Sequence, residues 1–532
     1  MSGAVVFALL AVTLPFGSVH IITQSAAVIA LSLAAIASLL MGTTHRLRGA
    51  TVMYILGLFC FGGFVLLHCL LTQTGSNHPL GSAFQRNLIP EFSEHFLPGF
   101  TLFLAGFFLA DRFLVVRSKL STPSRDSRHS RYLSAASHFS FTAERNLVFL
   151  GVGIALIALG HWLTDNGKLF WYFTPIHEGG SNRARWPFVN PNHLGFFLLP
   201  FFFLSLSFGL KKILSLIEIY YEARHRKQAK EKIVELLGKQ EVQQQVGGFG
   251  IALIGSLAIL LALVATLSRA TWIGLFLGTV AFAALTLRTL SDYEAQIIRS
   301  ATRSRKRRST VEFEAEEYSF QSSVVQPGTQ SMGGSVKFSL LLSCCFGALL
   351  FLLSIFLLGL GEGHERIEQR FAFGLISSVE DMRWQMFLDS WPLLSFWGIG
   401  FSRWDEVYQT ILSTGMAGLH PRYLHSEPFQ ILIELGAIGF LIAISVYFLP
   451  LAVLVREFRS YLTRYQPIYT AERRQSLYSR LFASALIAAW ISISVAICFD
   501  FSLRVPANLL LLSVLSALTI STASELKAQS SD

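Results

Sequence analysis

Charged residues are scarce in this chain of 532 residues. Asp, Glu, Lys and Arg together make up 14% of it, while hydrophobic residues make up 52%. A soluble globular protein averages roughly 25% charged residues, so the composition excludes that class. The sequence also has no repeat of fixed period and no glycine-rich phosphate loop, which argues against repeat proteins and P-loop nucleotide hydrolases.

Outer-loop cysteines and a cleavable signal sequence are missing as well. The five cysteines all lie inside apolar runs, which excludes a disulfide framework and indicates small core residues. They are Cys60, Cys69, Cys344, Cys345 and Cys498. The N-terminal region has neither a basic segment nor a credible cleavage site, so we expect residues 4–20 to be a retained first membrane span.

Long apolar runs are the main positive feature of the sequence. Many reach the roughly 18 nearly uncharged residues that a helix needs to cross a bilayer. We therefore predict an all-α polytopic membrane protein, a single membrane domain over residues 1–532 with about 12 transmembrane helices. The predicted spans are residues 4–17, 21–42, 50–72, 96–114, 146–163, 191–210, 247–267, 270–287, 338–360, 428–455, 481–499 and 503–521.

Basic residues are distributed unevenly between the two sides that these spans define. One set of loops and the C-terminal tail carry most of the 43 Lys and Arg residues. These loops are residues 43–49, 111–145, 211–246, 288–337 and 456–480. Because basic loops stay in the cytoplasm, we expect both termini there. The net charge of +10 then reflects membrane orientation and not nucleic-acid binding.

The longer loops differ in character on the two sides. The cytoplasmic loops 115–145 and 288–337 are polar and aperiodic, which predicts partial disorder and contact with anionic lipids. Within the third, 211–246, residues 211–240 have helical periodicity and are predicted to lie along the inner surface as an amphipathic helix. The main outer element is the loop 361–427 before the tenth span, which is predicted to contain helical pieces.

Two arginines stand beside predicted spans on the outer side. Arg269 interrupts two hydrophobic stretches in "ATLSRATWIGLF", and Arg383 lies among aromatic residues before the "WGIGF" turn. Each arginine has a purely structural explanation. The side chain of Arg269 can extend to the outer membrane–water interface, and Arg383 can form an ion pair with Glu380 or Asp381. The alternative is that both are fixed cations facing a cavity. A planar guanidinium suits a phosphate there, since it donates two parallel hydrogen bonds.

Polar residues also crowd the start of the span at 191–210, in "VNPNHLGFFLLP". Pro191 fits the first helical position, and Asn190 fits its N-cap. The cap explains neither the two polar residues of the first turn nor the two basic residues upstream. An anion or a sugar hydroxyl bound near this helix N-terminus would explain them. These residues are Asn192, His193, Arg183 and Arg185.

The start of the span at 428–455 carries groups suited to proton transfer, in "YLHSEPFQILIELGAIGF". His425 stands just before a helix N-terminus, whose positive dipole end disfavours a protonated imidazole. A neutral His425 suits a general base for a sugar hydroxyl. Glu427 and Glu434 share one helix face. Since a carboxylate facing lipid is costly, Glu434 is expected to face the bundle interior, either as a second catalytic candidate or as a structural partner of a neighbouring helix.

Four stretches together resemble one family, the bacterial O-antigen ligases and the related O-antigen and exopolysaccharide polymerases. They are "NPNHLG", "SRATWIGL", "GIGFSRW" and "HSEPFQILIELGAIGF", in the family's order within residues 183–440. The resemblance implies a GT-C-like membrane glycosyltransferase whose catalytic region is 183–440. It also implies that a glycan is taken from undecaprenyl diphosphate at the periplasmic face of the bacterial inner membrane, without a nucleotide-sugar.

The resemblance also implies roles for particular residues. The family has arginines at the positions of Arg269 and Arg383, which hold the diphosphate, and a histidine at the position of His425, which activates the acceptor. The acceptor is lipid A core for a ligase and a growing lipid-linked glycan for a polymerase, and both share the four stretches. The family commonly has Asn after this histidine, whereas Ser426 and Glu427 follow it here. This departure leaves open whether His425 or a carboxylate accepts the proton.

The chemistry of these residue types agrees with such a reaction. Transfer from a lipid diphosphate needs positive charge at the leaving group and an acceptor for one proton. The outer side has no Asp-x-Asp motif and no cluster with metal-ligand spacing. We therefore expect the arginines to stand in for a metal, no cofactor, and inversion at the anomeric carbon by direct displacement.

Two other functions fit part of the pattern. A transporter of an anion or a lipid would use buried arginines and discontinuous helices. It also predicts polar groups near mid-bilayer and two related halves, which the sequence does not have. A non-catalytic polysaccharide assembly protein is the second alternative, and it predicts that His425→Ala leaves assembly intact.

Overall fold

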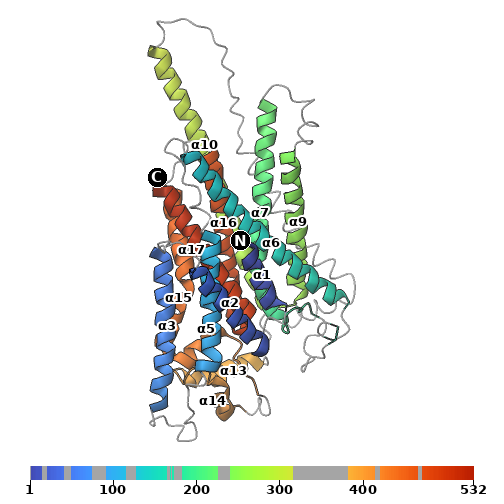
Figure 1. Ribbon diagram of the computed structural model, residues 1–532, viewed down its shortest axis with the longest axis vertical. Helices are drawn as coiled ribbons and strands as arrows, with labels where there is room; N and C mark the ends of the chain where they lie inside the picture. The colour runs from blue at the N-terminus through green and yellow to red at the C-terminus, as the bar shows by residue number, and fades with distance from the viewer. Residues whose placement is uncertain are drawn as a thin grey trace.

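The computed structural model of the chain is built from helices. It describes residues 2–14, 21–40, 49–74, 92–115, 128–164, 168, 171–172, 183–225, 240–314, 382–413, 420–464 and 470–531. Helices are the only regular secondary structure in these residues, which confirms the all-α prediction. Most of them run along the long axis of the molecule as one bundle (Figure 1).

Nine of the described helical segments are long and apolar enough to cross a membrane. They match nine of the predicted spans, so a polytopic membrane protein is supported. The helices are α3 (Gly49–Thr74), η3 with α5 (Phe92–Phe96 and Leu97–Val115), α6 (Arg128–Leu163), α7 (Pro191–His225), α9 (Gln240–Ala265), α10 (Arg269–Glu314), α15 (Glu427–Arg464), α16 (Thr470–Ile497) and α17 (Pro506–Ser531).

The other three predicted spans differ in their outcome. The span at 4–17 corresponds to α1 (Ser2–Thr13), whose 12 residues are shorter than a full crossing. The span at 21–42 corresponds to α2 (Ile21–Leu40), which has an apolar stretch over Ile22–Ile36. The span at 338–360 lies outside the described residues. A total of about 12 spans therefore stays a prediction.

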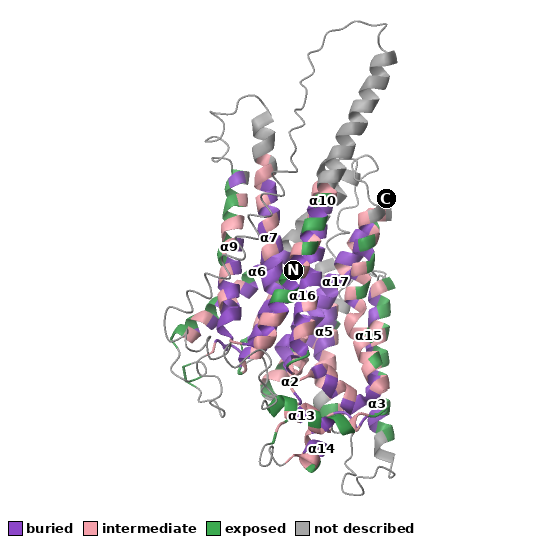
Figure 2. Cartoon of the chain, turned by 180° about the vertical axis from the view of Figure 1, so that it is seen from behind, coloured by how far each residue is buried: buried purple, intermediate pink, exposed green. Residues whose placement is uncertain are grey.

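Three helices form the centre of the bundle. The most apolar windows of α7, α16 and α17 are 89%, 83% and 78% buried, whereas those of α15 and α3 are only 17% and 22% buried. Figure 2 shows the same contrast, with buried residues concentrated in the middle. Small residues such as Ala and Ser recur around α16, which lets neighbouring helices approach it from every side. The outer helices have many exposed apolar side chains, as expected of helices that face lipid.

Several helices continue into segments that we expected to be loops. Residues 128–145 of the loop 115–145 belong to α6, and α10 extends through 288–314, beyond the neighbouring helices in Figure 1. Residues 211–225 are the continuation of α7, and 240–246 belong to α9. The first residues of the expected surface helix over 211–240 are thus, as far as Ile217, part of a candidate span, and the helix itself continues to His225. The reason is local, because runs of Lys, Arg, Glu, Gln and Ala favour helix once a membrane span has nucleated it.

Short elements close one end of the bundle, at the bottom of Figure 1. They are α13 (Met382–Ser390), η5 (Trp391–Leu393) and α14 (Trp404–Ile411). The prediction of helical pieces in the loop 361–427 is confirmed at α13, while residues 361–381 lie outside the described part. The contacts below place the starts of α7, α10, α15 and α17 here too. We call this the α13 end.

Candidate functional site

His425 precedes the first turn of α15 at the α13 end. Its backbone has a φ of 60°, in the left-handed region that non-glycine residues rarely adopt. The imidazole Nδ1 lies 3.4 Å from Oδ1 of Asp500, and the ring packs edge-on against Phe501 at 4.9 Å between centroids. The side chain remains 26% exposed. His425 is therefore held in an uncommon conformation and stays accessible to a substrate.

Asp500 lies in the turn between α16 and α17 and is almost fully buried. Its Oδ2 lies 3.7 Å from Nε2 of His193, so one carboxylate stands between two imidazoles. Burial alone raises the pKa of Asp500. The hydrogen bond with His425 and the charges of His193 and Arg383 outweigh burial, and they hold the pKa below its usual range. Asp500 is therefore a carboxylate at neutral pH.

A carboxylate neighbour decides which nitrogen of His425 carries a proton. An ionised carboxylate only accepts hydrogen bonds, so Nδ1 of His425 has to be the donor to Asp500. Nε2 is then the unprotonated nitrogen of the neutral ring. The pair thus presents Nε2 as a proton acceptor at an accessible position.

Arg383 joins this group from the short helix α13. Its Nη1 donates a hydrogen bond to the carbonyl of Phe499 at 3.2 Å. It also contributes to lowering the pKa of Asp500. The structure therefore brings Arg383, His193 and His425 together around one acid. The alternative partners Glu380 and Asp381 lie outside the described residues.

The residues around the start of α7 have different environments. The predicted cap is confirmed, because Oδ1 of Asn190 accepts a hydrogen bond from the N–H of Asn192 at 2.9 Å. Oδ1 of Asn192 accepts from Nη2 of Arg183, also at 2.9 Å, so this amide holds the preceding segment in place. Arg185 is 2% exposed. Of this set, His193 is the residue whose side chain reaches Asp500.

Arg269 is the first residue of α10, directly after the short turn that separates this helix from α9. Leu267, in that turn, has a φ of 48°. Thr271 packs against Gly195 of α7, where a Cβ atom would collide with its hydroxyl. This contact places Arg269 at the α13 end, near the start of the helix that carries His193. Its side chain is half-buried.

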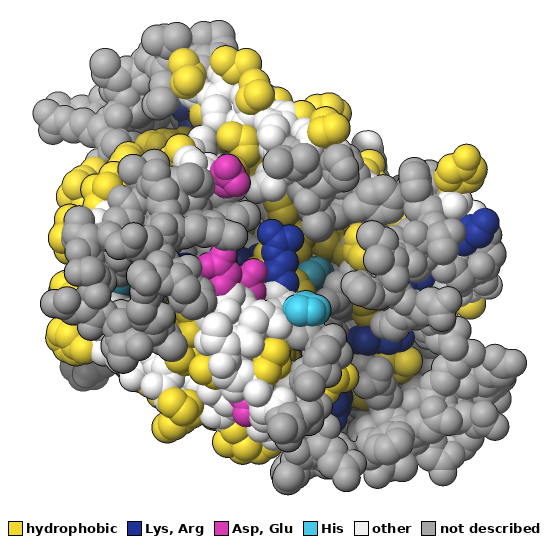
Figure 3. Space-filling model, turned by 90° about the horizontal axis from the view of Figure 1, so that it is seen from below, with side chains coloured by type: hydrophobic (Ala, Val, Ile, Leu, Met, Phe, Trp, Pro, Cys, Tyr) yellow, Lys and Arg dark blue, Asp and Glu magenta, His cyan; other side chains and the backbone are white. Residues whose placement is uncertain are grey.

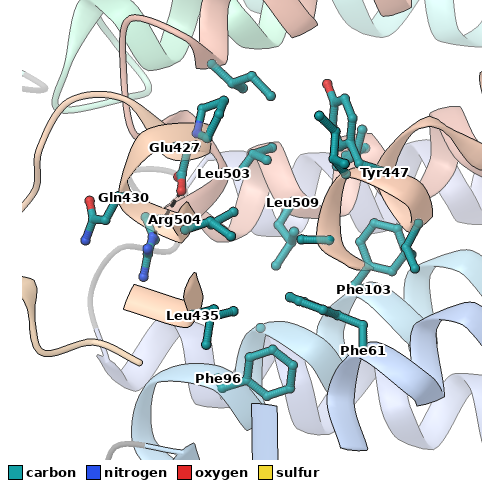
Figure 4. Close-up of a pocket in the computed structure, with 18 of the residues that line it drawn as sticks. Phe61, Phe96, Phe103, Glu427, Gln430, Leu435, Tyr447, Leu503, Arg504 and Leu509 are labelled. Atoms are coloured by element: carbon teal, nitrogen blue, oxygen red, sulfur yellow. Dashed lines mark hydrogen bonds and ion pairs between the residues drawn. The ribbon is translucent and has the colours of Figure 1, made fainter. Parts of the chain in front are cut away.

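Glu434 faces the bundle interior, as predicted, and is 1% exposed. Nε2 of Gln430 donates to its Oε1 at 2.8 Å. Arg504 lies between it and Glu427, with Nε 3.3 Å from Oε2 of Glu427 and Nη2 3.6 Å from Oε2 of Glu434. Burial lowers the pKa of Arg504, but the two carboxylates raise it beyond its ordinary value, so the guanidinium stays charged. Figure 4 shows Arg504 beside Glu427 and Gln430.

A break in α15 fixes the position of Glu434. Gly436 has a φ of 67° inside this helix, and the loop before α14 packs into the break. The N–H groups of Ile399 and Gly400 donate to the carbonyls of Ile433 and Glu434, each at 3.0 Å. Gly398 and Gly436 lie back to back, with no room for a Cβ atom on either. The "WGIGF" turn therefore pairs with unwound helix, which is tolerated where backbone lines a protein interior.

A cavity of about 970 Å³ opens beside Arg504. Its polar side is formed by Glu427, Gln430 and Arg504, opposite an aromatic side (Figure 4), and Glu434 beside Arg504 also lines it. The aromatic lining includes Phe61, Phe96, Phe100, Phe103, Tyr447 and Trp490. Seen from the α13 end, basic, acidic and histidine side chains gather near a hollow in the middle of this face (Figure 3).

Asp500 and Arg504 are the residues that sequence reasoning missed. Both lie in the short segment between α16 and α17. Asp500 falls between the predicted spans 481–499 and 503–521, whereas Arg504 falls inside the second of them, so the prediction assigned it to a helix. Within the described residues, no group of three or more His, Cys, Asp or Glu is arranged to hold a metal ion.

Comparison with known proteins adds no assignment. No protein-family model matches the chain, and no curated protein matches it significantly. The resemblance to O-antigen ligases and polymerases therefore stays a prediction that rests on the four sequence stretches.

Proposed function

We propose that the protein is a GT-C-like membrane glycosyltransferase of the O-antigen ligase and polymerase type. It would move a glycan from undecaprenyl diphosphate to a hydroxyl acceptor. The observation that carries the proposal is the contact of His425 with Asp500, next to Arg383 and His193. The α13 end would face the periplasm of a bacterial inner membrane, with both termini in the cytoplasm.

In this reaction the acceptor hydroxyl gives its proton to Nε2 of His425. The acceptor oxygen forms a bond to the anomeric carbon of the donor glycan. The bond from that carbon to the diphosphate oxygen breaks at the same time, and undecaprenyl diphosphate leaves with the electron pair. One displacement by one oxygen inverts the anomeric carbon.

The leaving diphosphate gains negative charge as this bond breaks. Arg383 and Arg269, both at the α13 end, would stabilise it by charge-assisted hydrogen bonds. Asp500 would hold His425 in the tautomer that accepts a proton and stabilise the imidazolium that forms. We expect the reaction to proceed without a metal or cofactor, because guanidinium groups supply the positive charge.

Complementation of a strain that lacks this protein tests the proposal. His425→Ala, Arg383→Ala and Arg269→Ala should each abolish surface polysaccharide on a gel while the variant still reaches the membrane. Arg269→Lys should also be poor, since one ammonium does not reproduce a two-bond phosphate contact. Accumulated short lipid-linked repeats would indicate a polymerase, and accumulated long chains a ligase.

His420→Ala is the matched control, because His420 is an exposed histidine close to His425 in the same loop. It should leave the polysaccharide unchanged. A His425→Ala variant with normal polysaccharide would refute the enzymatic proposal and favour a non-catalytic assembly protein.

A further inference from the structure

The cavity beside Arg504 differs in charge from the group around Asp500. Among the described lining residues there are five carboxylates and two arginines. The acids are Glu94, Asp405, Glu406, Glu427 and Glu434, and the arginines are Arg422 and Arg504. The lining as a whole therefore carries more acidic than basic groups, which disfavours a phosphate group in the cavity. A lipid diphosphate belongs near Arg383 and Arg269, not here.

One carboxylate oxygen at this polar side has no partner among the described residues, and a second has only the 3.6 Å ion pair with Nη2 of Arg504. Oε1 of Glu427 and Oε2 of Glu434 are buried and accept no hydrogen bond from any residue that the structure describes. Glu427 and Glu434 are only 3% and 1% exposed, and both line the cavity. Buried polar atoms in native proteins nearly always have a partner. A ligand that donates hydrogen bonds, such as a sugar with its hydroxyl groups, would supply it.

The remainder of the cavity suits a hydrocarbon chain. Aromatic and aliphatic side chains from α3, α5, α15, α16 and α17 line it. Its volume is near the upper end of the roughly 300–1,000 Å³ typical of small-molecule sites. The cavity is an apolar chamber among membrane spans with hydrogen-bonding groups at one end. Such a chamber fits an amphiphile that binds through both its polar headgroup and its hydrocarbon chain.

A short distance separates this cavity from His425. Tyr423 lines the cavity, and its ring packs at a tilt against Phe501, with 4.6 Å between the centroids. Phe501 in turn contacts both His425 and His193. A headgroup bound at Glu427 and Arg504 would therefore be separated from His425, the proton acceptor, by the rings of Tyr423 and Phe501.

We propose that this cavity binds the acceptor as a glycolipid whose headgroup next to the hydrocarbon is an uncharged sugar. The hydrocarbon occupies the aromatic chamber, and the sugar hydroxyls donate to Glu427 and Glu434, with Arg504 orienting both carboxylates. This inference rests on the proposed function. It favours transfer to a glycolipid over transfer to a second polyprenyl diphosphate, whose phosphates the acidic excess of the lining would disfavour.

Fluorescence quenching of Trp490, which lines the cavity, provides the test. The full-length protein in phosphatidylcholine nanodiscs is titrated with dodecyl maltoside brominated in its alkyl chain. Dodecyl phosphate with the same brominated chain serves as the anionic probe. The signal from Trp490 is the difference between the wild type and Trp490→Phe. The maltoside should quench it saturably, and the phosphate should not.

Conservative variants assign the headgroup contacts. Glu427→Gln and Glu434→Gln should each weaken maltoside binding by roughly tenfold, since each replaces a charged hydrogen-bond acceptor. Glu457→Gln is the matched control, because Glu457 is also an ion-paired carboxylate of α15 but lies outside the cavity lining. The shift of the unfolding temperature on adding maltoside gives a second readout if Trp490→Phe does not fold.

Three results would overturn the inference: equal or tighter binding of the phosphate probe, no saturable quenching, or unchanged binding by both Gln variants. Its failure is distinct from failure of the proposed function. If His425→Ala abolishes transfer while the phosphate probe binds the cavity, only the acceptor assignment fails. If the maltoside binds as expected but His425→Ala retains transfer, only the enzymatic proposal fails.

Discussion

Two buried ion pairs lie at opposite ends of the bundle, and their surroundings differ. Lys211 is about 30 Å along α7 from Pro191, at 1.5 Å per residue. Its Nζ lies 2.7 Å from Oε2 of Glu144, and the two side chains are 2% and 0% exposed. At the α13 end, Arg504 is 20% exposed and lies farther from its two carboxylates. The first pair is closed by packing, while the second opens onto a cavity.

This difference separates a structural role from a functional one. The ring of Phe482 lies 4.9 Å from Nζ of Lys211, and Glu144 is sealed among helices. A tight, enclosed pair mainly specifies how α6 and α7 pack. The groups at the α13 end are held less tightly, and the cavity and His425 are accessible from outside. Changes there should therefore affect transfer more than folding.

The largest expected effect is on catalysis, from Asp500→Asn. An amide in place of the carboxylate can donate to Nδ1 of His425, which would leave the proton on Nε2 and remove the base. The rate of glycan transfer should fall by about 10²–10⁴-fold, the usual contribution of general-base catalysis. Initial rates measured with a lipid-linked donor and the purified protein check this.

Asp292→Asn, a change on α10 toward the opposite end, is the control and should keep the wild-type rate. If Asp500→Asn loses less than about tenfold in rate, Asp500 does not position the base.

Lys211→Met should have the next largest effect, and on stability alone. It removes the cation that donates a hydrogen bond to the buried Glu144, and breaking such a buried pair typically lowers the free energy of unfolding by about 3–5 kcal/mol. Thermal unfolding of the purified protein measures this loss. The rate of transfer below the transition should stay near that of the wild type.

The double variant Glu144→Leu/Lys211→Met tests the reason for that loss. Replacing both charges by apolar groups should recover most of the stability. If Lys211→Met unfolds at the wild-type temperature, the buried pair does not stabilise the contact of α6 with α7.

Local features of the sequence predicted much of the α13 end. The apolar runs marked nine helices, Pro191 and Asn190 marked the start of α7, and the cost of a carboxylate in lipid placed Glu434 inside. Each of these follows from neighbours within a few turns. The same reasoning was wrong at 211–217, where charged residues suggested a surface helix although these residues belong to a candidate span and Lys211 has a buried partner on α6.

The partners of the site residues were beyond such reasoning. Asp500 meets His425 across 75 positions, and Arg504 meets Glu427 across 77. These contacts arise because α15, α16 and α17 pack with their ends at one level, which hydropathy alone does not determine. A turn of a few polar residues gave no indication of which helix start it would face.

Gly436→Ala should have a smaller effect at the α13 end. The φ of 67° strains a residue with a side chain, and the added Cβ would collide with the carbonyl of Phe396. Such strain costs about 1–3 kcal/mol of stability. It should also move Glu434 and weaken binding of the maltoside probe. Gly63→Ala on α3, where a Cβ meets nothing within 4 Å, is the control and should not destabilise the protein.

The smallest expected effect is the acid dependence of stability that Asp500 provides. Because the folded protein holds the pKa of Asp500 below its ordinary value, its contribution is complete above the unfolded pKa of about 3.9. It is lost as the pH falls through the folded pKa. The gap in unfolding temperature between the wild type and Asp500→Asn should therefore shrink on acidification below that point. A gap that widens instead would mean that burial dominates and that Asp500 is a neutral acid, which could not orient His425 as a base.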